Sequence, residues 1–325
     1  MLSSALYRRL RAIAVSPFEV SQALTARGRQ RFIAAARERD PRLHPSPPLF
    51  DVRSIASLTR PEGEAQIRRY CESHYLGGHE TIARCLGHYK MFLDTRDVGF
   101  APHIIMDGFW EYWITQFIVD RVKPAFCVLD IGANFGYYSL LLSDLVGPAG
   151  RCIAVEPNPN VASKLRKSLS VNGLAGRAEV REIALGRHSG EVSFFIPRDE
   201  PKNARIVSPD FEAQELGQVI AVEVATVDQL CSGIDRLDFV KVDAEGGEDD
   251  IILGMGDTLD RLKPSLLLEF NVGRDYNGEH LIHRLQEIYG QCGFVDYYGR
   301  LKPVTVSELL TKKVGEDWML FFAGR

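Results

Sequence analysis

The stretch that decides the fold runs from Val128 to Tyr138 and reads VLDIGANFGYY. The apolar run from Cys127 to Ile131, which overlaps the start of this stretch, predicts a buried parallel strand. Gly132 and Gly136 bracket a tight turn, and residues 138–143 then begin a helix. Strand, glycine turn and helix in this order are how an open α/β sheet makes a crevice for a nucleotide-like ligand.

The residues of the turn narrow the choice of ligand. A dinucleotide site requires G-x-G-x-x-G, but Asn134 and Tyr137 occupy the positions of the second and third glycines, and the G-K-[ST] of a mononucleotide loop is absent. Glu156 ends the next predicted strand, about 20 positions beyond the turn, where an acidic residue accepts hydrogen bonds from ribose hydroxyls. A ribose-bearing ligand without a pyrophosphate fits best, and S-adenosylmethionine is the commonest such cofactor.

A second motif lies downstream, at residues 241–248, and reads KVDAEGGE. Together, D-I-G-A-N-x-G and K-x-D-x-E-G-x-E resemble the FkbM-like family of S-adenosylmethionine-dependent methyltransferases, over roughly residues 91–271. Further matching stretches are residues 107–111, 226–230 and 264–269. The resemblance implies an α/β fold, with a Rossmann-like seven-stranded class I methyltransferase sheet behind an N-terminal helical extension. We expect the extension to span residues 1–88 and the methyltransferase domain residues 89–325.

The two motifs and their flanks supply the expected cofactor-binding residues. Glu111 belongs to the family's G-x-x-E segment, which lies over the cofactor pocket in that family; an exposed helix carboxylate is the alternative. The complete predicted set is Glu111, Asp130, Gly132, Ala133, Asn134, Gly136, Tyr137, Glu156, Pro157, Asn158, Ala184 and Asp243.

Acidic groups at the carboxyl edge of the sheet are the candidates for catalysis, because open α/β folds bind ligands there. We expect Asp243 to contact the reacting centre and Glu245 to act as general base, with Lys241 keeping Asp243 ionised. A structural ion pair that caps the following helix is the alternative. No metal is expected, although Asp243, Glu269 and Asn271 offer oxygen ligands for Mg²⁺.

Composition bounds the class of protein. The 325 residues carry a formal net charge of -4, which gives no general attraction to nucleic acid. The six cysteines are scattered without a C-x-x-C pair, and this favours a reducing cytoplasm over a disulfide framework. No apolar run reaches the length of a membrane span, and the N-terminus lacks the features of a signal peptide.

The order of patterns along the chain predicts the following organisation. Residues 1–44 are basic and predict two amphipathic helices whose basic faces are exposed to solvent. The alternative is that these basic faces attach the protein peripherally to an anionic membrane. Residues 54–86 predict a helix broken at Gly77 and Gly78. Residues 197–218 form an insertion that either edges the acceptor pocket or is a surface loop. Strands are predicted at residues 127–132, 151–156, 178–185, 191–196, 219–224, 237–242, 265–269, 294–298 and 318–323.

The sequence therefore predicts a cytoplasmic S-adenosylmethionine-dependent O-methyltransferase. The resemblance implies an acceptor hydroxyl on a sugar, a glycolipid or another hydroxylated small molecule, as in polysaccharide or natural-product biosynthesis. The alternatives are N-methylation of a small amine and a non-catalytic, cofactor-binding regulatory protein. The identity of the acceptor and the oligomeric state do not follow from the sequence.

Overall fold

The computed structural model describes residues 49–208, 210–212, 216–312 and 315–324. Residues 49–325 form one compact unit, and the predictions for residues 1–44 lie outside the described residues. None of the helices in the described ranges combines the length and the apolar character that a membrane span needs.

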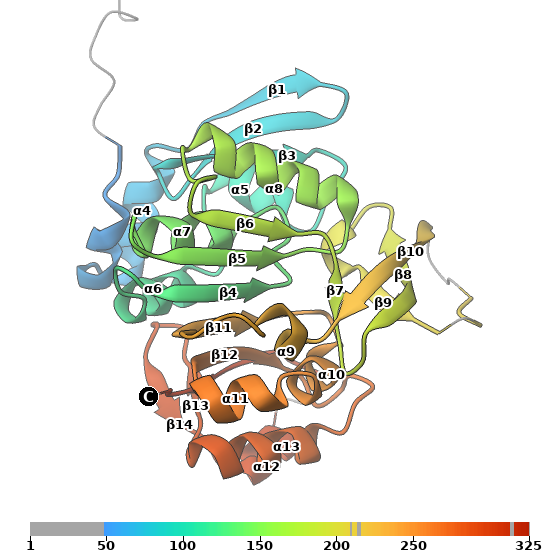
Figure 1. The fold of residues 1–325 in the computed structure, drawn as a ribbon. Helices are drawn as coiled ribbons and strands as arrows, with labels where there is room; N and C mark the ends of the chain where they lie inside the picture. The colour runs from blue at the N-terminus through green and yellow to red at the C-terminus, as the bar shows by residue number, and fades with distance from the viewer. Residues whose placement is uncertain (1–48, 209, 213–215, 313–314, 325) are drawn as a thin grey trace, which may run out of the picture. The chain divides into compact units, whose positions relative to one another are not determined.

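The central element of this unit is a mixed eight-stranded sheet (Figure 1). Its order is β14-β13-β15-β12-β11-β4-β5-β6, and the run from β12 to β6 is parallel. The bounds are β4 Cys127–Ile131, β5 Arg151–Val155, β6 Ala178–Arg181, β11 Phe239–Val242, β12 Ser265–Phe270, β13 Gly293–Val295, β14 Leu301–Pro303 and β15 Trp318–Phe322. The Rossmann-like methyltransferase sheet is thus confirmed, and the predicted antiparallel pair near the C-terminus is β13 with β15. The seven predicted strands gain β14 as an eighth, at the edge.

Helices cover both faces of this sheet because its central strands are apolar on both sides. In β4, Val128 packs into one core cluster and Leu129 into the other, and Cys152 and Ile153 alternate in the same way in β5. The helices that contribute to the first cluster are α5 Ala101–Met106, α6 Tyr112–Arg121, α7 Tyr137–Leu145 and α8 Pro159–Val171, with η2 Val52–Ser57 and α4 Arg60–Arg68. The second cluster includes α9 Val227–Leu230, α10 Glu248–Leu253, α11 Gly256–Leu262, α12 Gly278–Tyr289 and α13 Val306–Thr311.

The helix predicted over residues 54–86 is wrong beyond α4. The chain instead forms a three-stranded antiparallel sheet of β1 Ser73–Gly77, β2 Glu80–Cys85 and β3 Tyr89–Asp94. Burial in β2 alternates along the strand. Gly77 ends β1 and pairs with Glu80, and Gly78 and His79, both at positive φ, form the turn between the two strands. This sheet crosses the boundary predicted between residues 88 and 89.

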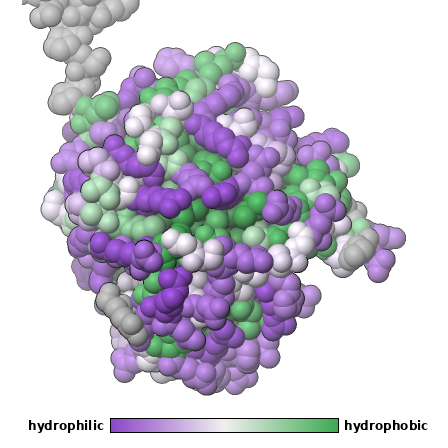
Figure 2. Space-filling view, viewed as in Figure 1, coloured by the Kyte–Doolittle hydropathy of each residue, from purple (hydrophilic) through white to green (hydrophobic). Residues whose placement is uncertain are grey.

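A second small sheet of four strands lies beside the main one. Its order is β7-β10-β8-β9, with β7 Ala184–Leu185, β8 Gly190–Pro197, β9 Arg205–Val207 and β10 Gly217–Ala225. The strand predicted over residues 178–185 is therefore two strands, because β6 pairs with β5 while β7 pairs with β10. Figure 2 shows apolar surface over this sheet. Its strands β9 and β10 carry the exposed apolar residues Ile206 and Val219.

Strand β3 is tied to α8 by hydrogen bonds that imitate a neighbouring strand. The Asn172 side chain accepts from the Lys90 N–H at 3.0 Å and donates to the Lys90 carbonyl at 2.7 Å. The Ser168 hydroxyl accepts from the Phe92 N–H at 2.9 Å. Ser168 in α8 and Asn172 at its C-terminus thus supply hydrogen-bond partners for three backbone groups on the outer edge of β3.

We predict that Asn172→Ala lowers the free energy of unfolding by about 1–2 kcal/mol, because two backbone groups of Lys90 lose their partner. Urea unfolding followed by circular dichroism measures this. Asn172→Asp, which keeps the acceptor and loses the donor, should fall between the wild type and the alanine variant. An unchanged midpoint in the alanine variant would show that these bonds do not hold β3.

Candidate active site

A cavity of about 550 Å³ opens at the carboxyl ends of β4, β5, β11 and β12. This volume lies within the range of small-molecule sites. The predicted site residues that line it are Glu111, Gly132, Ala133, Asn134, Tyr137, Glu156, Pro157, Ala184, Lys241, Asp243 and Glu245. Asp130, Gly136 and Asn158 are not among the lining residues.

The glycine turn brings two motifs of the chain into contact. Gly132 has φ +74, and a Cβ atom built on it would lie 1.7 Å from the carbonyl oxygen of Asp243. Glycine is therefore required here for the packing of one loop against another, rather than for close approach to a ligand. Asn134 is also left-handed, with φ +50, and its side chain accepts from the Phe135 N–H at 2.8 Å.

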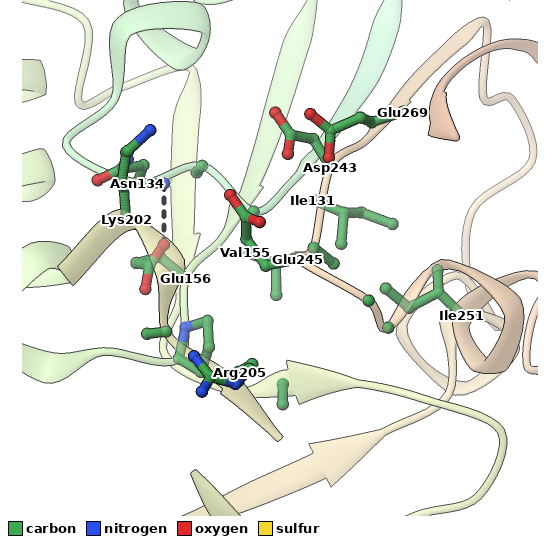
Figure 3. Close-up of a pocket in the computed structure, with 18 of the residues that line it drawn as sticks. Ile131, Asn134, Val155, Glu156, Lys202, Arg205, Asp243, Glu245, Ile251 and Glu269 are labelled. Carbon is green, nitrogen blue, oxygen red and sulfur yellow. Dashed lines mark hydrogen bonds between the residues drawn. The ribbon is translucent and has the colours of Figure 1, made fainter. Parts of the chain in front are cut away.

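Glu156 is held from both sides by the backbone of its surroundings. One carboxylate oxygen accepts from the Asn134 N–H at 2.9 Å (Figure 3). The other accepts from the Asn158 N–H at 2.8 Å. Each oxygen keeps a second lone pair that can accept from a ligand hydroxyl. Burial raises the pKa of Glu156 to about 7, although both backbone bonds oppose this shift. Asn158 thus acts on the site through Glu156.

Asp130 lies beneath the cavity, fully buried. One of its oxygens accepts from the Ser139 hydroxyl at 2.6 Å, while the other has no hydrogen-bond partner among the described residues. Burial raises its pKa, and the charge of Lys241, its register partner on β11, opposes that rise. The geometry makes Asp130 a neighbour of Lys241 rather than a wall of the cavity.

Lys241 and Asp243 form an ion pair at the end of β11. Lys241 Nζ lies 2.9 Å from Asp243 Oδ2, and its side chain is 1% exposed. Burial acts to raise the pKa of Asp243, but the charge and hydrogen bond of Lys241 lower it overall. Lys241 also lies 4.9 Å from the centroid of the Tyr138 ring, and the Tyr138 hydroxyl donates to Glu111 at 2.9 Å. The predicted contact between Lys241 and Asp243 is present, so Asp243 stays ionised.

Arg274 is a residue of this site that the motifs did not reveal. Its guanidinium contacts Glu248 at 2.8 Å, Glu269 at 2.5 Å and Glu245 at 3.3 Å. It stands in the loop after β12, outside both motifs, and only its place just beyond a predicted strand could have drawn attention to it.

Glu248 fixes the loop that carries Glu245. Its fully buried carboxylate accepts from the backbone N–H groups of Ala244 and Gly246, besides the contact to Arg274. Glu245 itself has φ +52, a conformation that this anchoring maintains. Burial and the nearby Asp243 raise the pKa of Glu245 to about 7, while Arg274 opposes the shift.

The three oxygen ligands considered for Mg²⁺ are not all at the cavity. Asp243 and Glu269 line it and share a hydrogen bond, and Figure 3 shows their carboxylates side by side. The side-chain oxygen of Asn271 instead accepts from the Gly273 N–H, and its amide nitrogen donates to Asp317. Over the described residues, no three His, Cys, Asp or Glu side chains cluster as a metal site would require.

The predicted insertion contributes to the wall of the cavity. Residues of η3 Pro201–Asn203 and β9 line it, among them Lys202 and Arg205. Neither was predicted as a site residue, because the insertion matches no motif.

A comparison with protein families matches residues 130–295 to the methyltransferase FkbM domain. The chain belongs to the FkbM methyltransferase family. This family and the observed sheet support S-adenosylmethionine-dependent methyl transfer as the class of activity.

The individual proteins that resemble this chain match it either at low identity or over only part of its length. It is 27% identical over 171 residues to the 2-O-methyltransferase NoeI of Sinorhizobium fredii, covering 48% of this chain and 68% of that protein. It is 47% identical over 107 residues to a protein-L-isoaspartate O-methyltransferase of Aeropyrum pernix, covering 31% of this chain and 41% of the relative. A crystal structure of a methyltransferase FkbM from Methylobacillus flagellatus is 17% identical, with a TM-score of 0.39 and coverage of 65% of this chain and 53% of that one. The chain thus spans only part of each relative.

We predict that Gly132→Ala lowers both thermal stability and cofactor affinity, because its methyl group collides with the Asp243 carbonyl. Gly147→Ala is a matched control: Gly147 has φ +66, but nothing lies within 4 Å of a Cβ atom there. The control should lose only about 1–2 kcal/mol, the cost of a left-handed residue, and bind cofactor normally. Calorimetry with S-adenosylmethionine and thermal unfolding compare the two. Equal losses in both variants would contradict the steric explanation.

We also predict a pH-dependent gain in stability from Glu111→Gln. Burial, aided by Asp243, raises the pKa of Glu111 to about 7. Between its unfolded pKa and about 7 the native state binds more protons, so the wild type loses stability as the pH rises. The variant avoids this loss, and its stability relative to wild type should be greater at pH 8 than at pH 5 by about 1–3 kcal/mol. Denaturant unfolding at both pH values measures it, and an equal difference at both would refute it.

Proposed function

We propose that this protein is an O-methyltransferase that acts on a hydroxyl of a sugar or another hydroxylated small molecule, with S-adenosylmethionine as the methyl donor. The observation that carries the proposal is one cavity that holds both a ribose-type carboxylate, Glu156, and a candidate base, Glu245. The similarity to a protein named 2-O-methyltransferase supports an oxygen acceptor.

The residues present fit the cofactor. Glu156 offers free lone pairs to ribose hydroxyls, because each of its oxygens uses only one in the backbone bonds. Ala184 and Leu185, which line the cavity, give apolar surface for an adenine ring. Asp243 and Glu111 provide the negative charge that a sulfonium and an ammonium group require. When bound, the cofactor supplies an electrophilic methyl group on sulfur.

The chain must supply alignment of the acceptor and a place for its proton. Glu245 suits the second task better than Asp243, because a general base works best when its pKa lies near the operating pH. Lys241 lowers the pKa of Asp243, so that carboxylate is a weak base and serves to orient the acceptor or balance positive charge. Arg274 keeps Glu245 beside Glu269 in the same wall of the cavity.

We expect Glu245→Gln to lower turnover by about 10²–10⁴-fold while leaving cofactor affinity within a few-fold of wild type. Wild-type turnover should rise with pH through about 7, as the Glu245 carboxyl loses its proton. Incubation with methyl-labelled cofactor and a panel of mono- and oligosaccharides, followed by mass analysis, provides the assay. The exposed Glu223→Gln serves as the control.

Several outcomes would contradict this proposal. A Glu245→Gln variant that keeps full turnover excludes Glu245 as the base, and methyl groups found only on nitrogen exclude O-methylation. Activity that EDTA abolishes and Mg²⁺ restores would show that a metal takes part. Asp243→Asn is a less specific test, because it leaves the buried Lys241 without its partner and lowers stability as well.

A further inference from the structure

The charges that line the cavity are unbalanced. Carboxylates outnumber cations: the acidic lining residues are Glu111, Glu156, Asp243, Glu245, Asp250, Glu269, Asp275 and Asp317, and the basic ones are Lys202, Arg205, Lys241 and Arg274. A ligand that places positive groups in this cavity is favoured, and a negative group on the same ligand is repelled unless a cation receives it.

Two of these cations, Lys241 and Arg274, already form ion pairs with acidic side chains. Lys241 pairs with Asp243, and Arg274 contacts four carboxylates. Arg205 lies 5.2 Å from the Phe195 ring and donates to the Asn203 carbonyl at 3.3 Å. Each of these cations therefore has protein partners.

Lys202 differs from the other cations of the cavity. Its ammonium group makes no hydrogen bond and no ion pair with any residue that the structure describes. Its Nζ lies 5.4 Å from the centroid of the Trp110 ring. Its charge nevertheless reaches the cavity, because it acts to lower the pKa of Glu245.

The aliphatic stem of Lys202 packs against Gly99. A Cβ atom built on Gly99 would lie 2.5 Å from Lys202 Cε, so glycine at this position leaves room for the lysine stem. The Val98 N–H donates to the Asp199 carbonyl at 2.9 Å and ties the insertion to the segment before α5. In the view of Figure 3, Lys202 lies on the side of the cavity that holds Asn134 and Glu156, away from Glu269.

We propose that Lys202 binds the carboxylate of the methionine moiety of the cofactor. The cofactor carries a sulfonium and an ammonium group, which match the carboxylates of the cavity, and one carboxylate, which needs a cation that is not already held in a hydrogen bond or ion pair. Lys202 meets this need, because its Nζ lies 5.4 Å from the ring of Trp110, the neighbour of Glu111, and the proposed function assigns Glu111 to the positive groups of the cofactor. This inference rests on that proposed function, because it takes S-adenosylmethionine as the ligand.

The test compares two ligands that differ in the methionine moiety. S-adenosylmethionine carries the amino-acid group, and 5′-methylthioadenosine lacks it. We expect Lys202→Met to raise the Kd for S-adenosylmethionine by about 10–100-fold, the effect of one lost charged hydrogen bond. The Kd for methylthioadenosine should stay within about twofold. Isothermal titration calorimetry gives both values without any acceptor or turnover.

Two further variants sharpen the comparison. Lys202→Arg keeps the charge and should retain most of the affinity for S-adenosylmethionine. Lys302→Met removes an exposed lysine of β14, which does not line the cavity, and should change neither Kd. Thermal unfolding of each variant confirms that it is folded.

The outcomes separate this inference from the proposed function. If the wild type binds S-adenosylmethionine and Lys202→Met binds it equally well, the inference is wrong while the proposed function stands; an anionic acceptor then becomes the ligand to test at Lys202. An equal loss of affinity for both ligands also overturns the inference, because the effect would not depend on the carboxylate. A wild-type protein that binds neither ligand refutes the proposed function itself.

Discussion

The site depends on a close approach between two loops that the sequence places about a hundred residues apart. The turn after β4 and the end of β11 meet where Gly132 faces the carbonyl of Asp243, with no room for a side chain. Because β4 and β11 are neighbouring parallel strands, their carboxyl ends emerge together, and this contact sets the distance between them. The position of Glu156 follows in turn, because it accepts from the backbone of the same glycine turn.

The second motif is explained by its anchoring as much as by its chemistry. Lys241 is buried and neutralises Asp243, while Glu248 receives the loop backbone and Arg274. Removing charges from water is costly, and the pairing of Lys241 with Asp243 offsets that cost by lowering the pKa of Asp243. These contacts fix the loop that carries Glu245. Asp243 and Glu245 both line the cavity, and of the two only Glu245 has a raised pKa, of about 7.

The predicted insertion, residues 197–218, is part of the small sheet formed by β7 to β10, because it contains β9. Ala184 leaves the line of β6, pairs with β10 and so brings a lining residue to the cavity. Residues 201–206, between β8 and β10, contribute Lys202 and Arg205 to the wall of the cavity. A loop of this kind adapts a common sheet to one ligand, since it can change without disturbing the strands beneath.

The sequence alone predicts the main sheet, the glycine turn and the pair of acidic motifs, because apolar periodicity and glycine placement are local properties of the chain. It also determined that Lys241 and Asp243 share a face, since alternate residues of a strand point the same way. The folded structure was needed to show that Asp130 is buried outside the cavity lining, that Arg274 joins Glu245, Glu248 and Glu269, and that the insertion contributes Lys202. It also decided that residues 73–94 form strands rather than a helix. These features arise from contacts between segments distant in sequence, and local pattern does not encode them.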